Sequence, residues 1–483
     1  MSRPRGSSGL APAALLTLLK ITISAVVLAS GFRAVSDDDF ARVVIAEEWA
    51  HTPRWDASGT SWLPFPFWIT GAVMMALGRG LFAARAAAFV LGVVAALLVY
   101  LAARWLGEGR RAALLGAAVA AIFPWSARLG VATVPELFTA ALTLIAIAAI
   151  ASQPGARTPT RLLAGAAAIT LASLSRYEAW PIALVFAALA ALDAARSRRG
   201  SAAIAALIAL VGSALWLVHN RLAHGDALHF LARVAAYRKA LGGAEDSAAA
   251  RLWAYPQAML REEPELFALL ATAVILLAWR EGRAGLGAAL GRYARPAAIV
   301  AAQIAALSLA MIKDGAPTHH PERAVLAALL LAAIVAGALA ARVLAGERRI
   351  LGAIALAAVA IAASLAIRPR APRETFTARG DEEAAGRAAA TLARPGEPVL
   401  IEVADYGYLA VIAALGRPED AVRDRSVDPR DAKRGSSFTD ATAIEARVTS
   451  AGARWVVARV GDPARAALGE PIVRRGAWGV FRP

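Results

Sequence analysis

Three consecutive aspartates, Asp37 to Asp39, stand in the stretch SDDDFARVVIAEEW, a few residues after an apolar run long enough to cross a bilayer. A carboxylate in such a place can take a proton from a substrate, provided that its surroundings give it a suitable pKa. Acidic side chains also complement the dipole at a helix N-terminus, and Ser36 and Asp39 have the spacing of a capping box. Helix capping and general-base catalysis therefore both stay open for this stretch.

A helix that begins at these aspartates would be amphipathic. Asp38 lies four residues and Asp39 three residues before Arg42, so a helix would pair these charges on one side. The apolar residues between Phe40 and Trp49 would form a flank suited to lie on a bilayer. The sequence therefore predicts an interfacial helix with an acidic beginning.

Charged residues at the edges of later apolar runs are further candidates. Glu136 follows Pro135, Arg176 and Glu178 stand in LSRYEAWP, and Arg323 opens another run. Each has a structural interpretation, because acids are common in a first helical turn and an interfacial arginine can pair with a nearby glutamate. In the functional interpretation, arginines beside carboxylates at the ends of spans gather an anionic lipid headgroup.

The stretch HHPER also invites a metal site, formed by His319, His320 and Glu322. Adjacent histidines do not converge on one ion without further ligands. We therefore interpret this stretch as an ordinary loop in which Arg323 is the functional candidate, and we assign no metal ligands.

The composition indicates a membrane protein that crosses the bilayer many times. Of 483 residues, 58% are hydrophobic, and the mean hydropathy is +0.54, far above that of a soluble chain. The net charge of +16 is explained by arginine-rich cytoplasmic loops rather than by binding of nucleic acid. The chain has no cysteine, which excludes disulfides, thiolate metal sites and cysteine nucleophiles.

The apolar runs predict eleven membrane spans. The spans lie near residues 10–31, 81–104, 112–126, 135–151, 161–175, 179–195, 201–219, 264–280, 296–312, 323–342 and 350–367. Residues 64–78 are apolar but short and contain two prolines, so they are interpreted as an interfacial or re-entrant helix. The loops that are basic and nearly free of acids define the inside, which places the N-terminus inside and the aspartates outside.

The composition changes at about Arg368, where a second domain is predicted over residues 368–483 after the membrane domain 1–367. Stretches with a period of two (398–403, 455–460 and 478–483) alternate with helix-like stretches (382–393 and 440–452), which indicates a small extracytoplasmic α/β domain. It contains no glycine-rich phosphate loop and no metal-ligand pattern. A cap on the membrane part is therefore favoured over an independent enzyme.

Together these motifs resemble a known family. DDFARVVIAEEW, the proline-rich aromatic stretch after it, RLGVATVPELF, LSRYEAWP and HHPERAVLAALLLA, in this order, look like the GT-C integral-membrane glycosyltransferases. The most similar groups are the protein O-mannosyltransferases and the aminoarabinose transferases (glycosyltransferase family 39). The resemblance covers about residues 10 to 370. It implies an all-α polytopic membrane protein that transfers a sugar, with inversion, from a polyprenyl-phosphate donor to a lipid, protein or glycan acceptor on the extracytoplasmic side of a bacterial-type inner membrane.

The resemblance also implies roles for particular residues. The catalytic acid of the family falls on Asp38, with Asp39 as its neighbour, and a second acidic position falls on Glu136. The basic positions fall on Arg176, followed by Glu178, and on Arg323, which would bind the donor phosphate or sugar. Relatives often carry a lysine before the prolines of the interfacial helix, and no lysine stands there in this chain.

The chemistry suits these residue types. A polyprenyl phosphate is already a good leaving group, so its charge must be held while one general base takes the acceptor proton. A glycosidase would need a second catalytic carboxylate, and none has a clear claim. No cofactor is implied, and a divalent cation is left open. Two alternatives remain: a transporter or lipid flippase, and a GT-C-like assembly subunit without catalytic activity.

Overall fold

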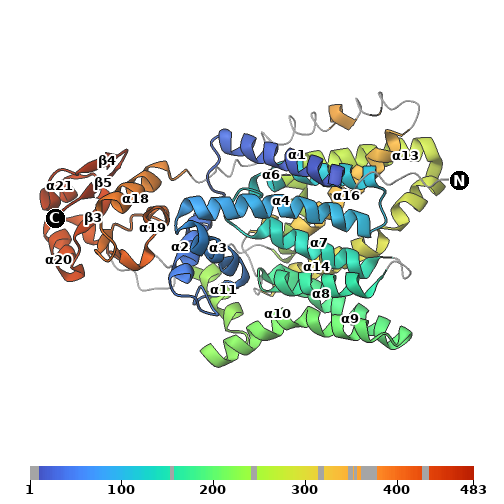
Figure 1. Ribbon diagram of the computed structural model, residues 1–483, viewed down its shortest axis with the longest axis horizontal. Coiled ribbons are helices and arrows are strands. Elements are labelled where there is room, and N and C mark those ends of the chain that lie inside the picture. Colours follow the sequence, from blue (N-terminus) through green and yellow to red (C-terminus); the bar gives the residue numbers. More distant parts are fainter. Residues whose placement is uncertain are drawn as a thin grey trace.

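The computed structural model describes residues 10–152, 157–240, 247–313, 320–345, 352, 356–359, 378–426 and 435–483. A bundle of long helices makes up most of the molecule, and a smaller domain with a sheet lies at one end of it (Figure 1). This arrangement confirms the predicted fold class, an all-α polytopic membrane part followed by a small α/β domain. The predicted boundary at residues 367 and 368 lies outside the described residues.

The bundle contains the following helices in chain order: α1 (Leu10–Ala29), α2 (Asp38–His51), α3 (Phe65–Leu77), α4 (Leu81–Trp105), α5 (Arg110–Ile122), α6 (Pro124–Leu129), α7 (Glu136–Ala151), α8 (Pro159–Ser173), η2 (Tyr177–Ala179), α9 (Trp180–Ser197), α10 (Gly200–His224), α11 (His229–Ala240), α12 (Ala248–Glu262), α13 (Pro264–Gly291), α14 (Ala294–Ile312), α15 (Pro321–Ala324) and α16 (Leu326–Val343). Among the described residues, six of them, α1, α4, α9, α10, α14 and α16, are long and apolar enough to cross a membrane.

Each of the first ten predicted spans coincides with a helix. The helices α5, α7 and α8 have 13, 16 and 15 residues, fewer than the roughly 17 that a helix needs to cross the hydrocarbon core of a bilayer. The helix α13 bends at Gly282, where a φ of 70° interrupts the helical backbone close to the predicted end of that span. Most of the eleventh predicted span, residues 350–367, lies outside the described residues.

The helices pack closely where small residues face each other. A Cβ added to Gly337 of α16 would lie 2.3 Å from the backbone nitrogen of Gly116 in α5. The two backbones are therefore in direct contact at this crossing. Such contacts between glycines are a common way to hold helices together in lipid, where burial of apolar surface gives little drive.

The short helix predicted over 64–78 is confirmed as α3, which begins after Pro64 and ends at Leu77, before Gly78. The expectation for α2 is corrected in one respect. Its apolar residues Phe40, Val43 and Val44 are buried, and they pack with α3 and with the C-terminal domain instead of facing lipid. A protein partner satisfies the same amphipathic pattern that a bilayer would.

The C-terminal domain is built on a five-stranded sheet with the order β2-β1-β3-β5-β4. Its elements are α18 (Gly380–Leu392), β1 (Val399–Ile401), α19 (Tyr408–Leu415), η4 (Pro418–Asp420), β2 (Ala421–Arg423), η5 (Ser437–Thr439), α20 (Ala441–Ala451), β3 (Trp455–Arg459), α21 (Asp462–Leu468), β4 (Val473–Arg475) and β5 (Trp478–Phe481). β1 is parallel to β2 and β3, whereas β5 is antiparallel to β3 and β4. The three strands and two helices predicted from periodicity are all present.

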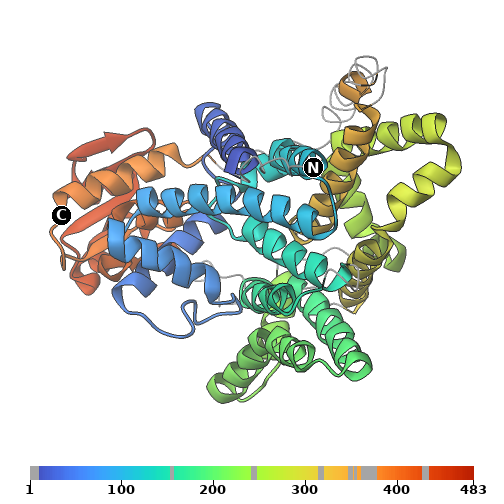
Figure 2. The same cartoon turned by 45° about the vertical axis from the view of Figure 1, so that its right-hand side comes forward.

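This domain docks on the bundle through α18 and α19, which lie beside α2, α3 and the start of α4 (Figure 2). One apolar core runs through the contact. Two ion pairs flank it: Arg85 lies 2.6 Å from Glu383, and Arg79 lies 2.7 Å from Glu419. The domain therefore covers the elements that carry the aspartate-rich stretch.

Candidate active site

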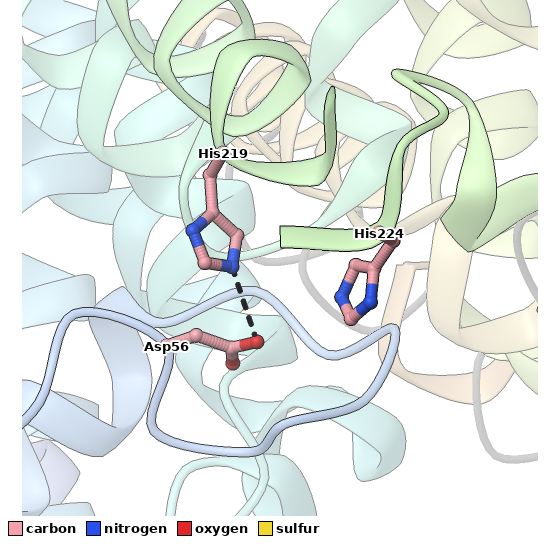
Figure 3. A group of neighbouring side chains, drawn as sticks. All are labelled: Asp56, His219 and His224. Carbon is pink, nitrogen blue, oxygen red and sulfur yellow. Dashed lines mark hydrogen bonds and ion pairs between the residues drawn. The ribbon is translucent and has the colours of Figure 1, made fainter. Parts of the chain in front are cut away.

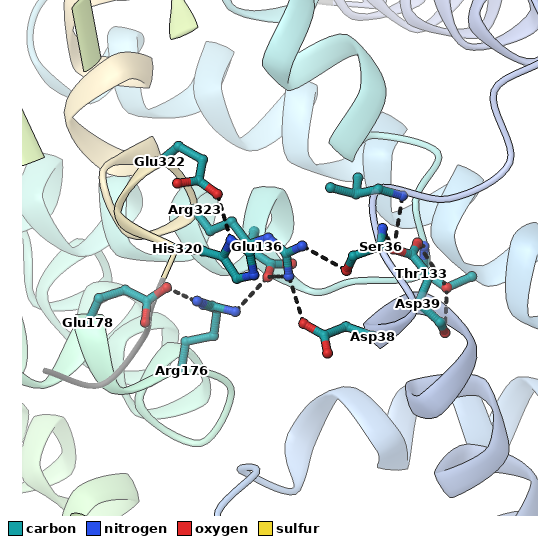
Figure 4. Close-up of polar contacts among 11 residues, drawn as sticks. Ser36, Asp38, Asp39, Thr133, Glu136, Arg176, Glu178, His320, Glu322 and Arg323 are labelled. Carbon is teal, nitrogen blue, oxygen red and sulfur yellow. Dashed lines mark hydrogen bonds and ion pairs between the residues drawn. The ribbon is translucent and has the colours of Figure 1, made fainter. Parts of the chain in front are cut away.

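The six residues singled out from the sequence come together in one polar cluster (Figure 4). They arrive from distant parts of the chain: the N-terminus of α2, the N-terminus of α7, the segment between α8 and α9, and the short helix α15. The six are Asp38, Asp39, Glu136, Arg176, Glu178 and Arg323. The structure thus brings the residues of these motifs together in space.

Arg323 is the link between the aspartate-rich stretch and the rest of the cluster. Its Nη1 donates to Oδ2 of Asp38 at 2.9 Å, and its Nη2 donates to Oγ of Ser36 at 2.8 Å. The same Nη1 lies 3.8 Å from Oε1 of Glu136. The side chain of Asp38 is 35% exposed while that of Arg323 is 4% exposed, so Asp38 presents its carboxylate at the open side of the cluster.

Arg176 stands between two carboxylates at the inner side. Its Nη1 donates to Oε1 of Glu136 at 2.6 Å, and its Nε donates to Glu178. Burial lowers the pKa of Arg176, but the carboxylates of Glu178 and Glu136 outweigh burial and raise this pKa above its usual value. The guanidinium therefore keeps its charge, and that charge is already balanced by protein carboxylates.

Asp39 acts as a brace for the loop. Its Oδ2 accepts from the backbone nitrogens of Val35 and Ser36, and its Oδ1 accepts from the backbone nitrogen of Thr133 at 3.0 Å. Burial raises the pKa of Asp39 to about 6, although Arg323 and the backbone hydrogen bonds act against it. Both oxygens are thus occupied, so of the two predicted catalytic acids Asp38 is the more accessible.

The capping interpretation is half confirmed. Asp39 does reach back to the backbone nitrogen of Ser36, as the third residue of a capping box does. The helix begins at Asp38 after Asp37, whose side chain makes no capping bond, and the Ser36 hydroxyl is bound by Arg323 instead. Capping and site assembly therefore share the same residues.

Arg42 is the residue whose role the sequence pattern misjudged. The predicted pairing of Asp38 and Asp39 with Arg42 is wrong, because Arg323 and backbone donors take those carboxylates. The Arg42 side chain is 9% exposed, lies 4.5 Å from the ring of Trp62, and has no hydrogen bond or ion pair to any residue that the structure describes. A buried guanidinium next to this cluster that makes no ion pair or hydrogen bond of its own to the described residues is suited to an anionic ligand.

The histidine stretch contributes one ion pair. His320 Nδ1 lies 3.0 Å from Oε1 of Glu322, and the backbone oxygen of Glu322 accepts from the indole of Trp125. His319 lies outside the described residues. Within the described part of the chain, His320 and Glu322 belong to no group of three metal-ligating side chains.

An apolar pocket lies next to the polar cluster. Its walls come from α3, α4 and residues 129–138, and its empty space is about 510 Å³, part of it open to solvent. Thr133, which binds Asp39, and Ser175, which precedes Arg176, are among its lining residues. The pocket thus brings an apolar surface to the edge of the charged cluster.

The motif resemblance agrees with a family-model match that covers part of the chain. A family model described as dolichyl-phosphate-mannose-protein mannosyltransferase matches residues 60–224. No curated protein matches the chain by sequence.

Two solved structures are similar over nearly the whole chain. The apo structure of ArnT from Cupriavidus metallidurans is 14% identical, with a TM-score of 0.61, and the match covers 97% of this chain and 98% of that one. ArnT from the same organism bound to undecaprenyl phosphate is 15% identical, with a TM-score of 0.59, over 98% of this chain and 96% of that one. At this identity the match establishes the fold.

Proposed function

We propose that this protein is an inverting glycosyltransferase that moves a sugar from a polyprenyl-phosphate donor to an acceptor at the extracytoplasmic face of the membrane. The observation that carries the proposal is a partly exposed carboxylate, Asp38, that is bound by the buried Arg323 and lies near a second buried guanidinium, Arg42, which forms no ion pair with the described residues. A base and an anion site side by side are what this reaction needs.

In the proposed reaction, Asp38 takes the proton of the acceptor hydroxyl as the acceptor oxygen attacks the anomeric carbon. The bond from that carbon to the phosphate oxygen breaks, and the polyprenyl phosphate leaves with the bonding electron pair. Its charge needs to be held, but the group needs no proton. Arg323 keeps Asp38 oriented through the hydrogen bond of 2.9 Å.

Arg42 is the residue that we assign to the departing phosphate. Arg176 and Arg323 were the candidates from the sequence, yet Glu136 and Glu178 already balance the charge of Arg176, and Arg323 is bound to Asp38. Arg42 has no such partner among the described residues, and Trp62 holds the guanidinium in place by stacking. In this assignment Arg42 takes the place that the missing lysine of the interfacial helix leaves open.

The pocket between α3 and α4 suits the isoprenoid part of the donor. Its lining is mostly apolar and includes Thr133, which binds Asp39 of the charged cluster. A lipid chain in the pocket would therefore place its phosphate near Arg42 and Asp38. The undecaprenyl phosphate bound to the similar ArnT structure supports a donor of this class.

The orientation follows from charge. The basic loops between the spans, such as RWLGEGRR at 104–111, favour the cytoplasmic side, which places α2 and the C-terminal domain on the extracytoplasmic side of an inner membrane. Attaching a thiol reagent that cannot cross membranes to a cysteine placed at Thr52, an exposed residue directly after α2, tests this, because the chain has no cysteine of its own.

Replacing Asp38 by asparagine tests the proposal. Cells that lack the gene are complemented with the wild type, Asp38→Asn or the control Asp462→Asn, which changes an exposed carboxylate in α21. Mass spectrometry of their glycolipids and glycoproteins is expected to show a sugar adduct in cells with the wild type or Asp462→Asn and none in cells with Asp38→Asn. The Asp38→Asn protein should still bind polyprenyl phosphate. A fully active Asp38→Asn variant would favour a transporter or an inactive assembly subunit.

A further inference from the structure

A second cluster of chemically active side chains lies in the same molecule and takes no part in the proposed reaction. Asp56 stands in the segment between α2 and α3, and His219 and His224 stand in the last turns of α10 (Figure 3). One ligand atom from each of the three lies within 4.8 Å of the others. The cluster joins residues that are more than 160 positions apart in the sequence.

The donor set and its spacing match a metal site. Two ligands of a tetrahedral zinc ion lie about 3.3 Å apart, since Zn–N and Zn–O bonds measure about 2.0–2.1 Å. His219 Nε2 and Asp56 Oδ2 are already 3.3 Å apart. Two imidazoles and one carboxylate are ligands typical of Zn²⁺, and three protein ligands leave one position for water.

The surroundings hold two of the ligands in place. Asp56 Oδ1 accepts from the backbone nitrogens of Ser58 and Gly59, at 3.1 and 3.0 Å, which leaves Oδ2 directed at the histidines. The ring of His219 stacks on Trp216, with 5.1 Å between ring centroids. Hydrogen bonds of this kind behind a ligating carboxylate are a regular feature of metal sites.

An ordinary ion pair explains only part of the arrangement. Asp56 and one imidazole would be enough for a pair, yet three of the six histidines of the chain gather here. The ring centroids of His219 and His224 are 6.2 Å apart. The ring centroids of His224 and His229 are 4.2 Å apart, and these two rings are nearly parallel. His224 is exposed, so an ion has access from solvent.

We infer that Asp56, His219 and His224 bind a divalent zinc ion, with water in the fourth position. The ion fastens the segment between α2 and α3 to the end of α10. This segment continues to Ser61, whose backbone oxygen accepts from the hydroxyl of Tyr177 at 2.6 Å, directly after Arg176. The zinc site is therefore a structural clamp that adjoins the active site, and its existence does not depend on the proposed glycosyl transfer.

The test is metal binding by the full-length protein in detergent, purified with a tag that contains no histidine. After removal of metal with a chelator, the wild type is expected to bind one zinc ion per chain by isothermal titration, and its thermal unfolding midpoint is expected to rise with zinc. Cobalt(II) in its place is expected to give the intense visible bands of a tetrahedral site. His224→Gln should weaken zinc binding by tenfold or more, and Asp56→Asn provides a second variant at a different ligand.

His51→Gln is the matched control, because His51 is an exposed histidine that pairs with Glu419 and lies outside the cluster. It should bind zinc as the wild type does. The inference is overturned when the wild type takes up no zinc at micromolar concentration, or when His224→Gln and Asp56→Asn both bind as tightly as the control.

Discussion

Arg379 binds both carboxylate oxygens of Asp37, with Nε 3.0 Å from Oδ1 and Nη2 2.9 Å from Oδ2. Arg379 immediately precedes α18 of the C-terminal domain, and Asp37 immediately precedes Asp38. A bidentate contact of this kind fixes both distance and direction. The C-terminal domain therefore holds the stretch that carries the proposed base, in addition to covering α2 and α3.

Loss of this contact is expected to impair turnover more than folding. In Arg379→Ala, kcat should fall about 10- to 100-fold, because small displacements of a catalytic group have effects of this size, while KM for the donor changes little. Arg379→Lys should not restore the rate, since lysine cannot bind two oxygens in a fixed plane. Steady-state kinetics with Arg387→Ala as the control, an exposed arginine of α18, checks this expectation. Equal kcat values for the two alanine variants would contradict it.

Arg42 provides a prediction about donor binding. Arg42→Gln removes the charge that we assign to the phosphate, so its affinity for polyprenyl phosphate should fall about 10- to 100-fold, a loss expected for a charge-assisted contact. The wild type and Arg42→Gln should bind the dephosphorylated polyprenol equally weakly. Arg54→Gln, at an exposed arginine in the next loop, should bind like the wild type. Undiminished phosphate binding by Arg42→Gln would return the role to Arg176 or Arg323.

The buried Glu47 makes the free energy of unfolding depend on pH. Glu47 is fully buried in α2, and neither carboxylate oxygen has a hydrogen-bond partner among the described residues. Burial raises the pKa of Glu47 well above its usual value, so the folded state binds a proton that the unfolded state has lost. This group therefore lowers stability progressively as pH rises from its unfolded pKa, about 4.3, toward its higher folded pKa.

The variant Glu47→Met removes this destabilising carboxyl group. It should raise the unfolding midpoint by a few degrees at pH 8, and by less at pH 5, because the free-energy cost of keeping the proton in the folded state grows as pH rises above the unfolded pKa. Thermal unfolding in detergent at both pH values measures the difference. Glu445→Met, at an exposed position of α20, serves as the control and should show no such trend. A stabilisation that is larger at pH 5 than at pH 8 would refute the argument.

Periodicity in the sequence predicts helices and strands, whereas the partners of individual side chains depend on tertiary contacts. The apolar runs located the long helices of the bundle, and the family resemblance assigned Asp38 and Arg323 to one site although 285 residues separate them. The local spacing rule failed for Arg42, because a distant arginine competes for Asp38 and no helical period reveals that. The edge strands β2 and β4 were missed because their segments, AVR and VRR, are partly exposed and contain arginine, whereas the equally short β1 stands in a longer apolar stretch. The burial of α2 under the C-terminal domain was missed for a related reason: an amphipathic pattern does not say whether lipid or protein covers it.

The contact between α5 and α16 gives a last prediction, about the membrane core. A Cβ at position 337 would lie 2.3 Å from the backbone nitrogen and 2.4 Å from the Cα of Gly116, and backbone atoms cannot rotate away as a side chain can. Gly337→Ala must therefore push the two helices apart, and overpacking of this kind costs about 1–3 kcal/mol. Gly200→Ala is the matched control, because nothing lies within 4 Å of an added Cβ at this first residue of α10 and alanine is the better helix former. The unfolding midpoint in detergent should fall for Gly337→Ala and stay level or rise for Gly200→Ala, and an equal response of the two variants would show that the crossing is looser than the structure has it.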